Sequence, residues 1–271
     1  IDLDEVRRLA IEHRPKMIVA GYSAYSRLID WSIFRQIADE VDAIFLVDAA
    51  HIIGLIAGKA HPNPVPHADI VTATTHKALR GPRGGLILSR EAFAKDLNKA
   101  VFPFAQGGSI NSQIAAKALA FELCSRPDYE EYAHQIVRNA AVLADTMGEE
   151  GFRIVSGRTE NHMFLADVRS IDEELTGKEA SQLLDRVGIT LNRNSIPFDP
   201  RSPFITSGLR LGTPAVTTAG MRQEQMVTLG RLIVEVLRHR ESPAMVAELE
   251  GQIEELSAAF PGYPESFPGH V

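Results

Sequence analysis

The sequence predicts an α/β protein in which a mostly parallel sheet, covered by helices, is followed by a smaller α+β part. Short apolar segments alternate with helical patterns in the first half, and longer helical patterns follow Gly108. At 271 residues, with 45% hydrophobic and 23% charged residues, the chain also has the composition of a globular protein that can bury a sizeable core. Short apolar strands separated by helices are typical of a parallel sheet that is covered on its faces.

In the first half, helices and strands can be assigned from this pattern. A helix over residues 3–13 ends before Pro15, because proline cannot continue it without losing a hydrogen bond. Asp30 is placed to cap a second helix that runs through Val41. The predicted strands are short apolar segments at Met17 to Ala20, Ala43 to Asp48, Ala68 to Thr72 and Gly85 to Leu88.

In the second half, helices predominate. Two are predicted at 110–125 and 128–149, and in the second of these apolar residues from Tyr129 to Met147 recur at helical spacing. The α+β part has predicted strands near 152–155, 162–167 and 207–211, and helices at 177–187, 221–238 and 243–258. We place the domain boundary near Arg126–Pro127, which gives domains 1–126 and 127–271. The end, FPGYPESFPGHV, is rich in Pro and Gly and is predicted to be irregular.

Composition argues against several classes of partner. A net charge of −7 and a pI near 5.7 do not suggest binding to a nucleic acid or to an anionic membrane. The longest apolar runs are too short to span a bilayer, and the first residues show no signal or transit peptide. The single cysteine, Cys124, allows neither an intrachain disulfide nor a cysteine cluster for a metal, which fits a reducing, cytoplasmic location.

The stretch from Thr74 to Gly85, TTHKALRGPRGG, carries the strongest chemical signal. Its Lys77 lies between a strand and a turn rich in Gly and Pro, where a tight, partly desolvated pocket can hold the amine. Desolvation disfavours the ammonium form, and the neutral amine is the form that makes a Schiff base with an aldehyde. A surface lysine in a turn is the alternative.

Asp48, at the end of a buried strand, strengthens the functional interpretation of Lys77. Ligands bind beyond the carboxyl ends of the strands in such a sheet, so Ser23, Asp48 and residues 74–77 are expected to converge there. Pyridoxal phosphate needs an anion beside its ring nitrogen if the ring is to act as an electron sink, and Asp48 suits that role. Asp48 could instead cap the next turn, and His51 could contact the cofactor ring or cap the same turn.

Two further segments suit anions. Gly107 and Gly108 precede a predicted helix and could offer backbone N–H groups to a phosphate, although such a pair is also a routine turn. Arg210 lies in a predicted strand between apolar neighbours, where its guanidinium group needs an anionic partner. A substrate carboxylate suits the planar guanidinium group, and an internal salt bridge is the alternative. No arrangement for serine or cysteine hydrolysis stands out, and the histidines lack metal-ligand spacing.

Several motifs closely resemble the serine hydroxymethyltransferase family, in the family's order and over nearly the whole chain. A His-Lys pair followed by Gly-Pro also occurs in cysteine desulfurases, whereas the Asn-Pro-Val-Pro-His and Ser-Gly-Leu-Arg-Leu-Gly-Thr-Pro stretches point to this family. The resembling segments are residues 20–27, 47–51, 63–69, 74–85, 192–197 and 207–214. The resemblance implies fold type I of the pyridoxal-phosphate-dependent transferases, with residues 1–126 in the large cofactor-binding domain and 127–271 as a small C-terminal domain.

The resemblance also implies a role for each candidate residue. Lys77 would form the Schiff base with the cofactor, and Asp48 would pair with the ring nitrogen. Ser23 and His51 would contact the phenolic oxygen side of the cofactor, and Thr74 and His76 would support cofactor exchange beside the lysine. Gly107 and Gly108 would bind the phosphate of the partner subunit's cofactor. Arg210 would bind the substrate carboxylate, and Asn194 would lie near the pteridine of tetrahydrofolate. A site shared in this way would belong to a homodimer.

The implied reaction moves a one-carbon unit between serine and tetrahydrofolate, giving glycine and methylenetetrahydrofolate. Two alternatives stay open: a pyridoxal-phosphate-dependent aldolase, transaldolase or methylserine hydroxymethyltransferase, and a non-catalytic truncated relative. Desulfurase chemistry is set aside because it needs a mobile nucleophilic cysteine, and Cys124 lies in an apolar helical pattern.

Two features depart from the family pattern. The chain opens on Ile1 inside a helical pattern, where family members carry a preceding N-terminal section, so we interpret it as a piece that is inactive alone. Ser109 to Ser112 stands where the family usually shows Pro and a later His, next to the predicted phosphate-binding glycines.

Overall fold

The structure is a computed structural model that describes residues 1–262, so most of the predicted irregular end, residues 263–271, lies outside the described residues. Contacts divide the chain into two compact units, Ile1–Ser23 with Leu28–Ala133, and Ala24–Arg27 with His134–Val271. The division falls inside helix α6 (Pro127–Glu149), whereas the predicted domain boundary lies at Arg126–Pro127; that boundary stays a prediction.

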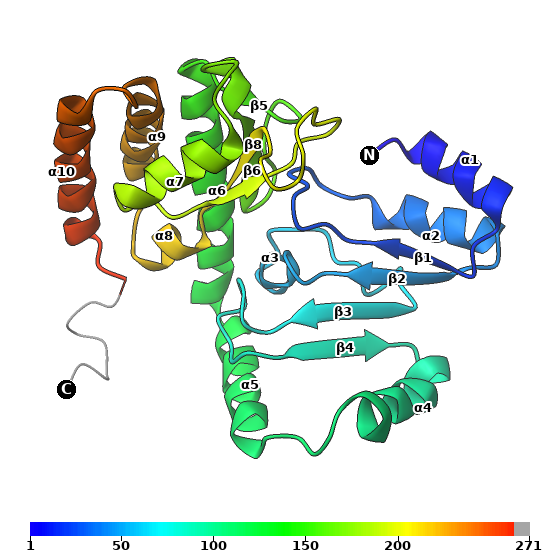
Figure 1. Cartoon of the computed structure of the whole chain (residues 1–271). Helices are drawn as coiled ribbons and strands as arrows, with labels where there is room; N and C mark the ends of the chain where they lie inside the picture. The colour runs from blue at the N-terminus through cyan, green and yellow to red at the C-terminus, as the bar shows by residue number, and fades with distance from the viewer. Residues whose placement is uncertain (263–271) are drawn as a thin grey trace. The chain divides into compact units, whose positions relative to one another are not determined.

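The first unit is built on a mixed, mostly parallel sheet in the order β1-β2-β3-β4 (Figure 1). Its strands are β1 (Met17–Ala20), β2 (Ile44–Asp48), β3 (Ile70–Thr74) and β4 (Gly85–Ser89). Strands β1, β2 and β3 run parallel, and β4 pairs antiparallel with β3. The predicted α/β class and mostly parallel sheet are therefore confirmed, and the carboxyl ends of β1, β2 and β3 share one edge.

Two helices of the first unit begin at an aspartate whose side chain caps them. In α1 (Leu3–His13), the Asp2 carboxylate accepts a hydrogen bond from the Glu5 amide. In α2 (Trp31–Glu40), Asp30 accepts hydrogen bonds from the amides of Ser32 and Ile33, as its position predicts. The inner face of α2 is apolar, and its Phe34 ring stacks on Phe45 of β2 with centroids 5.8 Å apart. This contact fixes α2 on the sheet.

Several elements of the first unit were not predicted. Helix α3 (Ile53–Ala57) has only five residues, which is too short to show helical periodicity. Helix α4 (Glu91–Lys99) and the π-type turn η1 (Ala100–Ala105) contain no buried residue, and α4 was missed although its sequence is amphipathic. Helix α5 (Asn111–Cys124) follows and matches the prediction to within one residue at each end. Cys124 is buried at its C-terminal end, so the helical placement of the cysteine is confirmed.

The second unit contains an antiparallel sheet in the order β5-β6-β8-β7. Its strands are β5 (Arg153–Ile154), β6 (Met163–Asp167), β7 (Asn192–Asn194) and β8 (Gly208–Gly212). All five residues of β6 are buried, which makes it the centre of this unit's core. Strand β7 was not predicted, because its three polar residues show no alternation.

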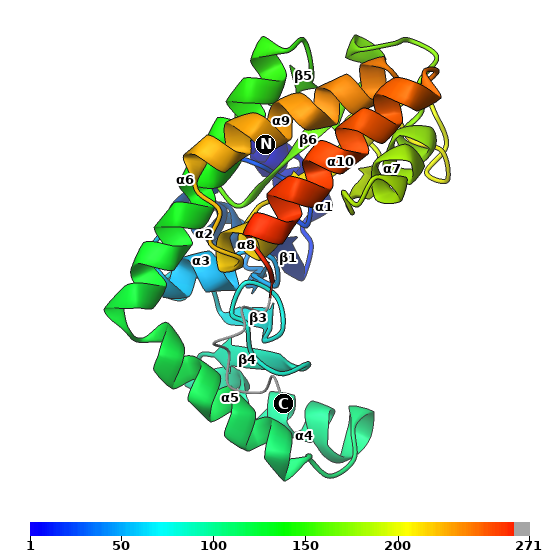
Figure 2. The same ribbon diagram turned by 90° about the vertical axis from the view of Figure 1, so that its left-hand side faces the viewer.

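The helices of the second unit close this core. Besides the part of α6 from His134 onward, they are the 3₁₀ turn η2 (Val168–Ser170), α7 (Gly177–Arg186), α8 (Pro214–Thr218), α9 (Gln223–Arg238) and α10 (Pro243–Ala259). Helices α9 and α10 pack side by side (Figure 2). A capping box between Thr176 and Glu179 begins α7. The predicted helices 177–187, 221–238 and 243–258 match α7, α9 and α10 to within two residues at each end, whereas the short α8 and η2 were not predicted.

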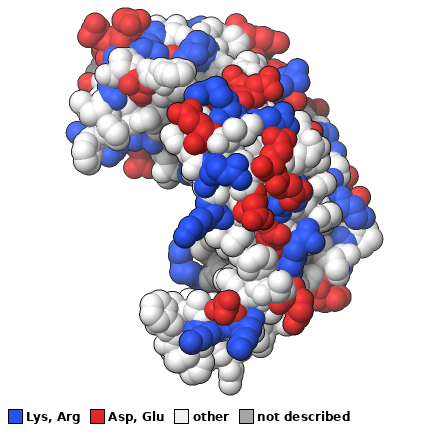
Figure 3. Space-filling view, turned by 90° about the vertical axis from the view of Figure 1, so that its right-hand side faces the viewer, with Lys and Arg blue, Asp and Glu red and all other residues white. Residues whose placement is uncertain are grey.

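The surface is consistent with the composition. On the face shown in Figure 3, acidic and basic side chains are interspersed. Within residues 1–262, no helix is both long and apolar enough to cross a membrane.

A buried histidine in the first unit predicts a loss of stability in acid. His61 is 5% exposed, its Nδ1 lies 3.1 Å from the Pro62 carbonyl oxygen, and its Nε2 has no hydrogen-bond partner among the described residues. Burial lowers the pKa of His61, against the opposing effect of the Pro62 carbonyl. The unfolded chain therefore binds the proton at a higher pH, near 6.5, than the folded chain does.

We expect the free energy of unfolding to fall as the pH drops from about 6.5 toward the lowered pKa, by at most about 1.4 kcal/mol per pH unit from this residue. Urea unfolding at a series of pH values, compared between the unsubstituted chain and His61→Gln, measures the contribution. The His61→Gln chain should have the shallower slope in this window. Parallel pH profiles would contradict the prediction.

Candidate active site

The segments that follow β1, β2 and β3 meet at the carboxyl edge of the first sheet. A Cβ atom on Gly21 would lie 2.1 Å from the Asp48 carbonyl oxygen, so the chain after β1 touches the end of β2. The Thr74 hydroxyl, at the end of β3, donates a hydrogen bond to the Ala50 carbonyl at 3.1 Å. The sequence predicts this convergence of strand ends, whereas the chemical roles of the side chains there stay predictions.

Asp48 lies at the centre of this edge with its side chain accessible. One carboxylate oxygen, Oδ1, accepts a hydrogen bond from the Ala50 amide at 3.0 Å, so Asp48 does cap the turn after β2. The residue is nevertheless exposed, as is Ser23, and His51 is half-buried. Asp48 can therefore cap the turn through Oδ1 and still form an ion pair with a ligand.

Hydrogen bonds within the turn that carries Lys77 close the turn at its base. The Thr75 amide donates to the Gly84 carbonyl at 2.9 Å, and the Gly81 amide donates to the Thr75 carbonyl at 2.8 Å. The Thr75 hydroxyl donates to the Pro82 carbonyl at 2.6 Å. A Cβ atom on Gly81 would lie 2.8 Å from the Thr75 carbonyl oxygen, so this closure requires glycine.

The tight pocket that the sequence predicts around Lys77 is not formed by the first unit, and this corrects the expectation. Lys77 is exposed, whereas the next two residues, Ala78 and Leu79, are each 4% exposed. The reason is that the small apolar side chains of the turn take the inward positions, which leaves the long polar one outside. Desolvation of the amine would have to come from a bound ligand or another protein segment.

His76 and the two glycines are accessible to a ligand. The Nδ1 atom of His76 lies 3.4 Å from the Gly84 carbonyl oxygen, and its Nε2 lies 3.4 Å from Arg83 Nη1. Gly107 and Gly108 are exposed between η1 and α5, and a Cβ atom on either would meet nothing within 4 Å. This space could admit a phosphate group, and a routine turn remains the alternative.

Arg210 and Asn194, the other two predicted site residues, lie on neighbouring strands of the second unit. Arg210 stands in β8 between two buried leucines, as predicted, and its Nη2 donates to Asn192 Oδ1 on β7 at 3.2 Å. Asn194, at the end of β7, donates from Nδ2 to the Ser195 carbonyl at 2.7 Å. The β7–β8 pairing therefore sets the orientation of both residues.

Sequence reasoning missed Asp199, which organises the loop between these two strands. Its carboxylate accepts hydrogen bonds from the Ser207 hydroxyl at 2.7 Å, the Ser207 amide at 2.8 Å and the Ile196 amide at 3.2 Å. Burial opposes ionisation, but these hydrogen bonds outweigh it and lower the pKa of Asp199. An aspartate in a Pro-rich loop is the only sequence signal, and that signal does not identify its partners.

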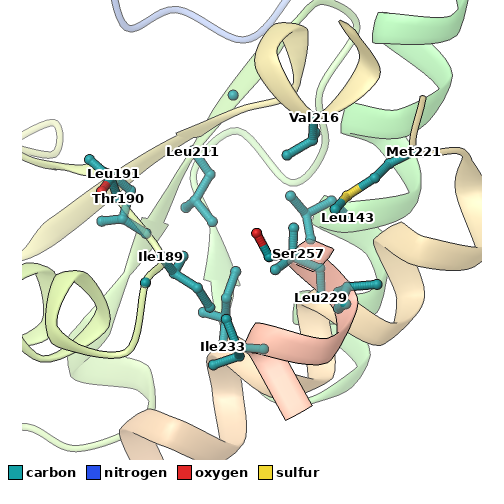
Figure 4. Close-up of a pocket in the computed structure, with 14 residues that line it drawn as sticks. Leu143, Ile189, Thr190, Leu191, Leu211, Val216, Met221, Leu229, Ile233 and Ser257 are labelled. Atoms are coloured by element: carbon teal, nitrogen blue, oxygen red, sulfur yellow. The ribbon is translucent and has the colours of Figure 1, made fainter. Parts of the chain in front are cut away.

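The second unit also contains an apolar cavity of about 190 Å³ (Figure 4). Leu211, Val216, Met221 and Ile233 point into it, and Ser257 brings a hydroxyl. No lining residue is titratable, so the cavity has no group for acid–base or Schiff-base chemistry. Within residues 1–262, no group of three or more His, Cys, Asp or Glu is arranged to hold a metal ion.

The fold and the turn that carries Lys77 define an α/β protein whose candidate site lies at the carboxyl edge of parallel strands. The family model for serine hydroxymethyltransferase matches residues 1–233. A serine hydroxymethyltransferase of Myxococcus xanthus (strain DK1622) is 53% identical over 263 residues, which cover 97% of this chain and 62% of that relative. The chain belongs to the serine hydroxymethyltransferase family, and it spans 62% of the length of this curated relative.

Proposed function

We propose that this chain supplies the lysine-bearing part of a serine hydroxymethyltransferase, which uses pyridoxal phosphate to interconvert serine and glycine and passes a one-carbon unit to tetrahydrofolate. The observation that carries the proposal is the position of Lys77: its turn lies beside the end of β2, where Asp48 is exposed, in a chain of this family. Activity, substrates and partners belong to the proposal, since the chain spans 62% of its relative.

The residues at the sheet edge fit the cofactor chemically. An amine, a carboxylate, a hydroxyl and an imidazole are available there from Lys77, Asp48, Ser23 and His51, and the first three residues are exposed. When bound, pyridoxal phosphate would supply the electron sink for bond cleavage at the amino acid. In the proposal, Lys77 holds the cofactor covalently, Asp48 lies beside its ring nitrogen, and Ser23 and His51 contact its phenolic oxygen side.

Substrate binding and proton handling fall to other residues. Arg210 would bind the substrate carboxylate, for which its planar fork is suited. Its Nη2 donates to Asn192 Oδ1, which supports the orientation of the guanidinium group. Thr74 and His76, on either side of Thr75, would support exchange of the cofactor between Lys77 and the incoming amino acid. Asn194 would lie near the pteridine of tetrahydrofolate.

The proposal extends to assembly and location. Gly107 and Gly108 would bind the phosphate of the cofactor held by a second copy of the chain, which makes the protein a homodimer or a higher oligomer. The open space around these glycines supports this. We also propose a cytoplasmic location, in line with the single, buried thiol of Cys124.

The first test is whether Lys77 captures the cofactor. The purified chain, titrated with pyridoxal phosphate, is expected to develop a visible absorption band, and reduction with borohydride followed by peptide mass mapping should locate the adduct on Lys77. Lys77→Ala should lose the band. Lys95→Ala, an exposed lysine of α4, is the matched control and should keep it. A band that persists in Lys77→Ala would contradict the assignment.

A second measurement separates the transferase from an aldolase. In the enzyme that contains this chain, serine cleavage should depend on tetrahydrofolate. Cleavage that proceeds equally well without the folate would favour an aldolase or transaldolase on the same residues. A protein that binds the cofactor at Lys77 but cleaves no amino acid would favour the non-catalytic alternative.

A further inference from the structure

The first turn of α6 makes a buried contact with the Lys77 turn. Tyr129 is 2% exposed, and its hydroxyl donates to the Ala78 carbonyl, next to Lys77, at 2.9 Å. The Gly54 carbonyl of α3 is also within reach of this hydroxyl, at 3.2 Å. A tyrosine 51 residues further along the chain therefore links the Lys77 turn to the short helix α3.

Two glycines one turn apart on α3 allow this contact to be so close. A Cβ atom on Gly54 would lie 2.6 Å from both the Cβ and the carbonyl carbon of Ala78. A Cβ atom on Gly58 would lie 2.3 Å from the Cβ of Ala133 on α6. The Lys77 turn, α3 and α6 therefore approach one another at backbone distance. The carbonyl oxygens of Gly54 and Ala78 face the same hydroxyl. The Gly54 carbonyl also accepts a hydrogen bond from the Gly58 amide at 3.1 Å, whereas the Ala78 carbonyl accepts from Tyr129.

The residues after Ala78 are held from the same side. The Cys124 thiol, at the end of α5, donates to the Leu79 carbonyl at 3.6 Å. The Arg80 guanidinium lies over the Tyr132 ring at 4.0 Å and at 5.6 Å from the centre of the Tyr129 ring. Arg80 also adopts a φ of 56°, which is uncommon for a residue other than glycine and is maintained here by its surroundings. Side chains of α5 and α6 thus hold each of the three residues after Lys77.

We propose that Tyr129 is the positioning residue of Lys77: by fixing the Ala78 carbonyl against α3, it sets the direction in which the Lys77 side chain leaves the turn. Because Lys77 itself is exposed, its side chain receives its orientation from the backbone of the turn, and that backbone is fixed through Tyr129. The inference rests on the proposed function only where it concerns the cofactor. Tyr129 acts through Ala78 and touches neither cofactor nor substrate.

The hydroxyl of Tyr129 keeps its proton throughout the working pH range. Burial raises the pKa of Tyr129 strongly, and the neighbouring Cys124 adds to the shift. The residue is therefore a permanent donor. Removing the hydroxyl alone, as in Tyr129→Phe, keeps the ring beside Arg80 and takes the donor away from the Ala78 carbonyl, while the Gly54 carbonyl keeps its bond from the Gly58 amide.

The test compares Tyr129→Phe with Tyr132→Phe, the same change one helical turn later. Hydrogen–deuterium exchange of the chain without cofactor is followed in peptides spanning 75–84, with a β2 peptide as the internal reference. In Tyr129→Phe, exchange over 75–84 is expected to rise about tenfold while β2 stays unchanged. The pyridoxal phosphate concentration that half-saturates the Lys77-dependent band should rise about tenfold as well. Tyr132→Phe should stay within about twofold for both quantities.

Each result decides one question. Equal behaviour of the two variants over 75–84 would overturn the proposal, and so would an exchange increase in Tyr129→Phe that extends equally to β2, since this indicates general destabilisation. If the unsubstituted chain captures no cofactor at Lys77, the proposed function fails for this chain. In that case the exchange data still decide whether Tyr129 holds the turn.

Discussion

Replacing Gly21 with alanine is expected to lower the free energy of unfolding by about 4 kcal/mol, through a strained backbone and an overpacked contact. Gly21 has a φ of 138°, a backbone conformation that residues other than glycine rarely adopt. The new Cβ atom would lie 2.1 Å from the carbonyl oxygen of Asp48 and 2.8 Å from its carbonyl carbon. Both neighbours are backbone atoms at the end of β2, so the strand ends would have to separate.

Urea unfolding followed by circular dichroism measures this loss. Gly108→Ala is the matched control, because a Cβ atom there meets nothing within 4 Å and the change should stay within about 0.5 kcal/mol. The two substitutions add the same methyl group, so their difference measures the backbone strain at Gly21 together with the contact with Asp48. A Gly21→Ala chain as stable as Gly108→Ala would mean that β1 and β2 do not end against each other as described.

The spacing of apolar residues in the sequence predicted the helices and strands that bury one face at a regular period. The central strands and the longer helices were located to within two residues in most cases, because each buries a face whose spacing is visible in the sequence, as α2 does with Trp31, Phe34 and Ile37. Helix α3 and strand β7 escaped, since they are too short to show a period, whereas α4 was missed although its residues have an amphipathic helical spacing. The Asp30 cap was predicted because capping depends on neighbours within three residues.

In the candidate site, too, some features could be predicted from the sequence and others could not. Strand ends placed Asp48 and Thr74 at one edge, because parallel strands share their carboxyl ends. The contact between Tyr129 and Ala78 could not be predicted, because it joins residues 51 positions apart and the pattern in the sequence does not show which turn lies against the first turn of α6. The exposure of Lys77 was mispredicted for a related reason: whether a turn covers its lysine depends on which neighbours face inward, and here these are Ala78 and Leu79.

Replacing Gly54 with alanine is expected to cost about 3 kcal/mol of unfolding free energy and to displace the Lys77 turn. The added Cβ atom would lie 2.6 Å from the Cβ and carbonyl carbon of Ala78 and 2.9 Å from the Leu79 amide nitrogen. These atoms belong to the backbone of a hydrogen-bonded turn, apart from one methyl group, so no side-chain rotation can relieve the contact. Either α3 or the turn must move, and Tyr129 can then no longer reach both carbonyls.

Gly251→Ala provides the opposite control for Gly54→Ala. Gly251 is an exposed residue inside α10 whose added Cβ atom meets nothing within 4 Å, so alanine there should stabilise the chain by up to about 1 kcal/mol through helix propensity. Urea unfolding should therefore move in opposite directions for the two variants. If Gly54→Ala keeps full stability and captures pyridoxal phosphate as the unsubstituted chain does, the backbone contact between α3 and the Lys77 turn does not constrain the lysine. If the Gly54→Ala chain no longer captures pyridoxal phosphate at a urea concentration where it is still folded, the substitution has displaced the Lys77 turn without unfolding the chain.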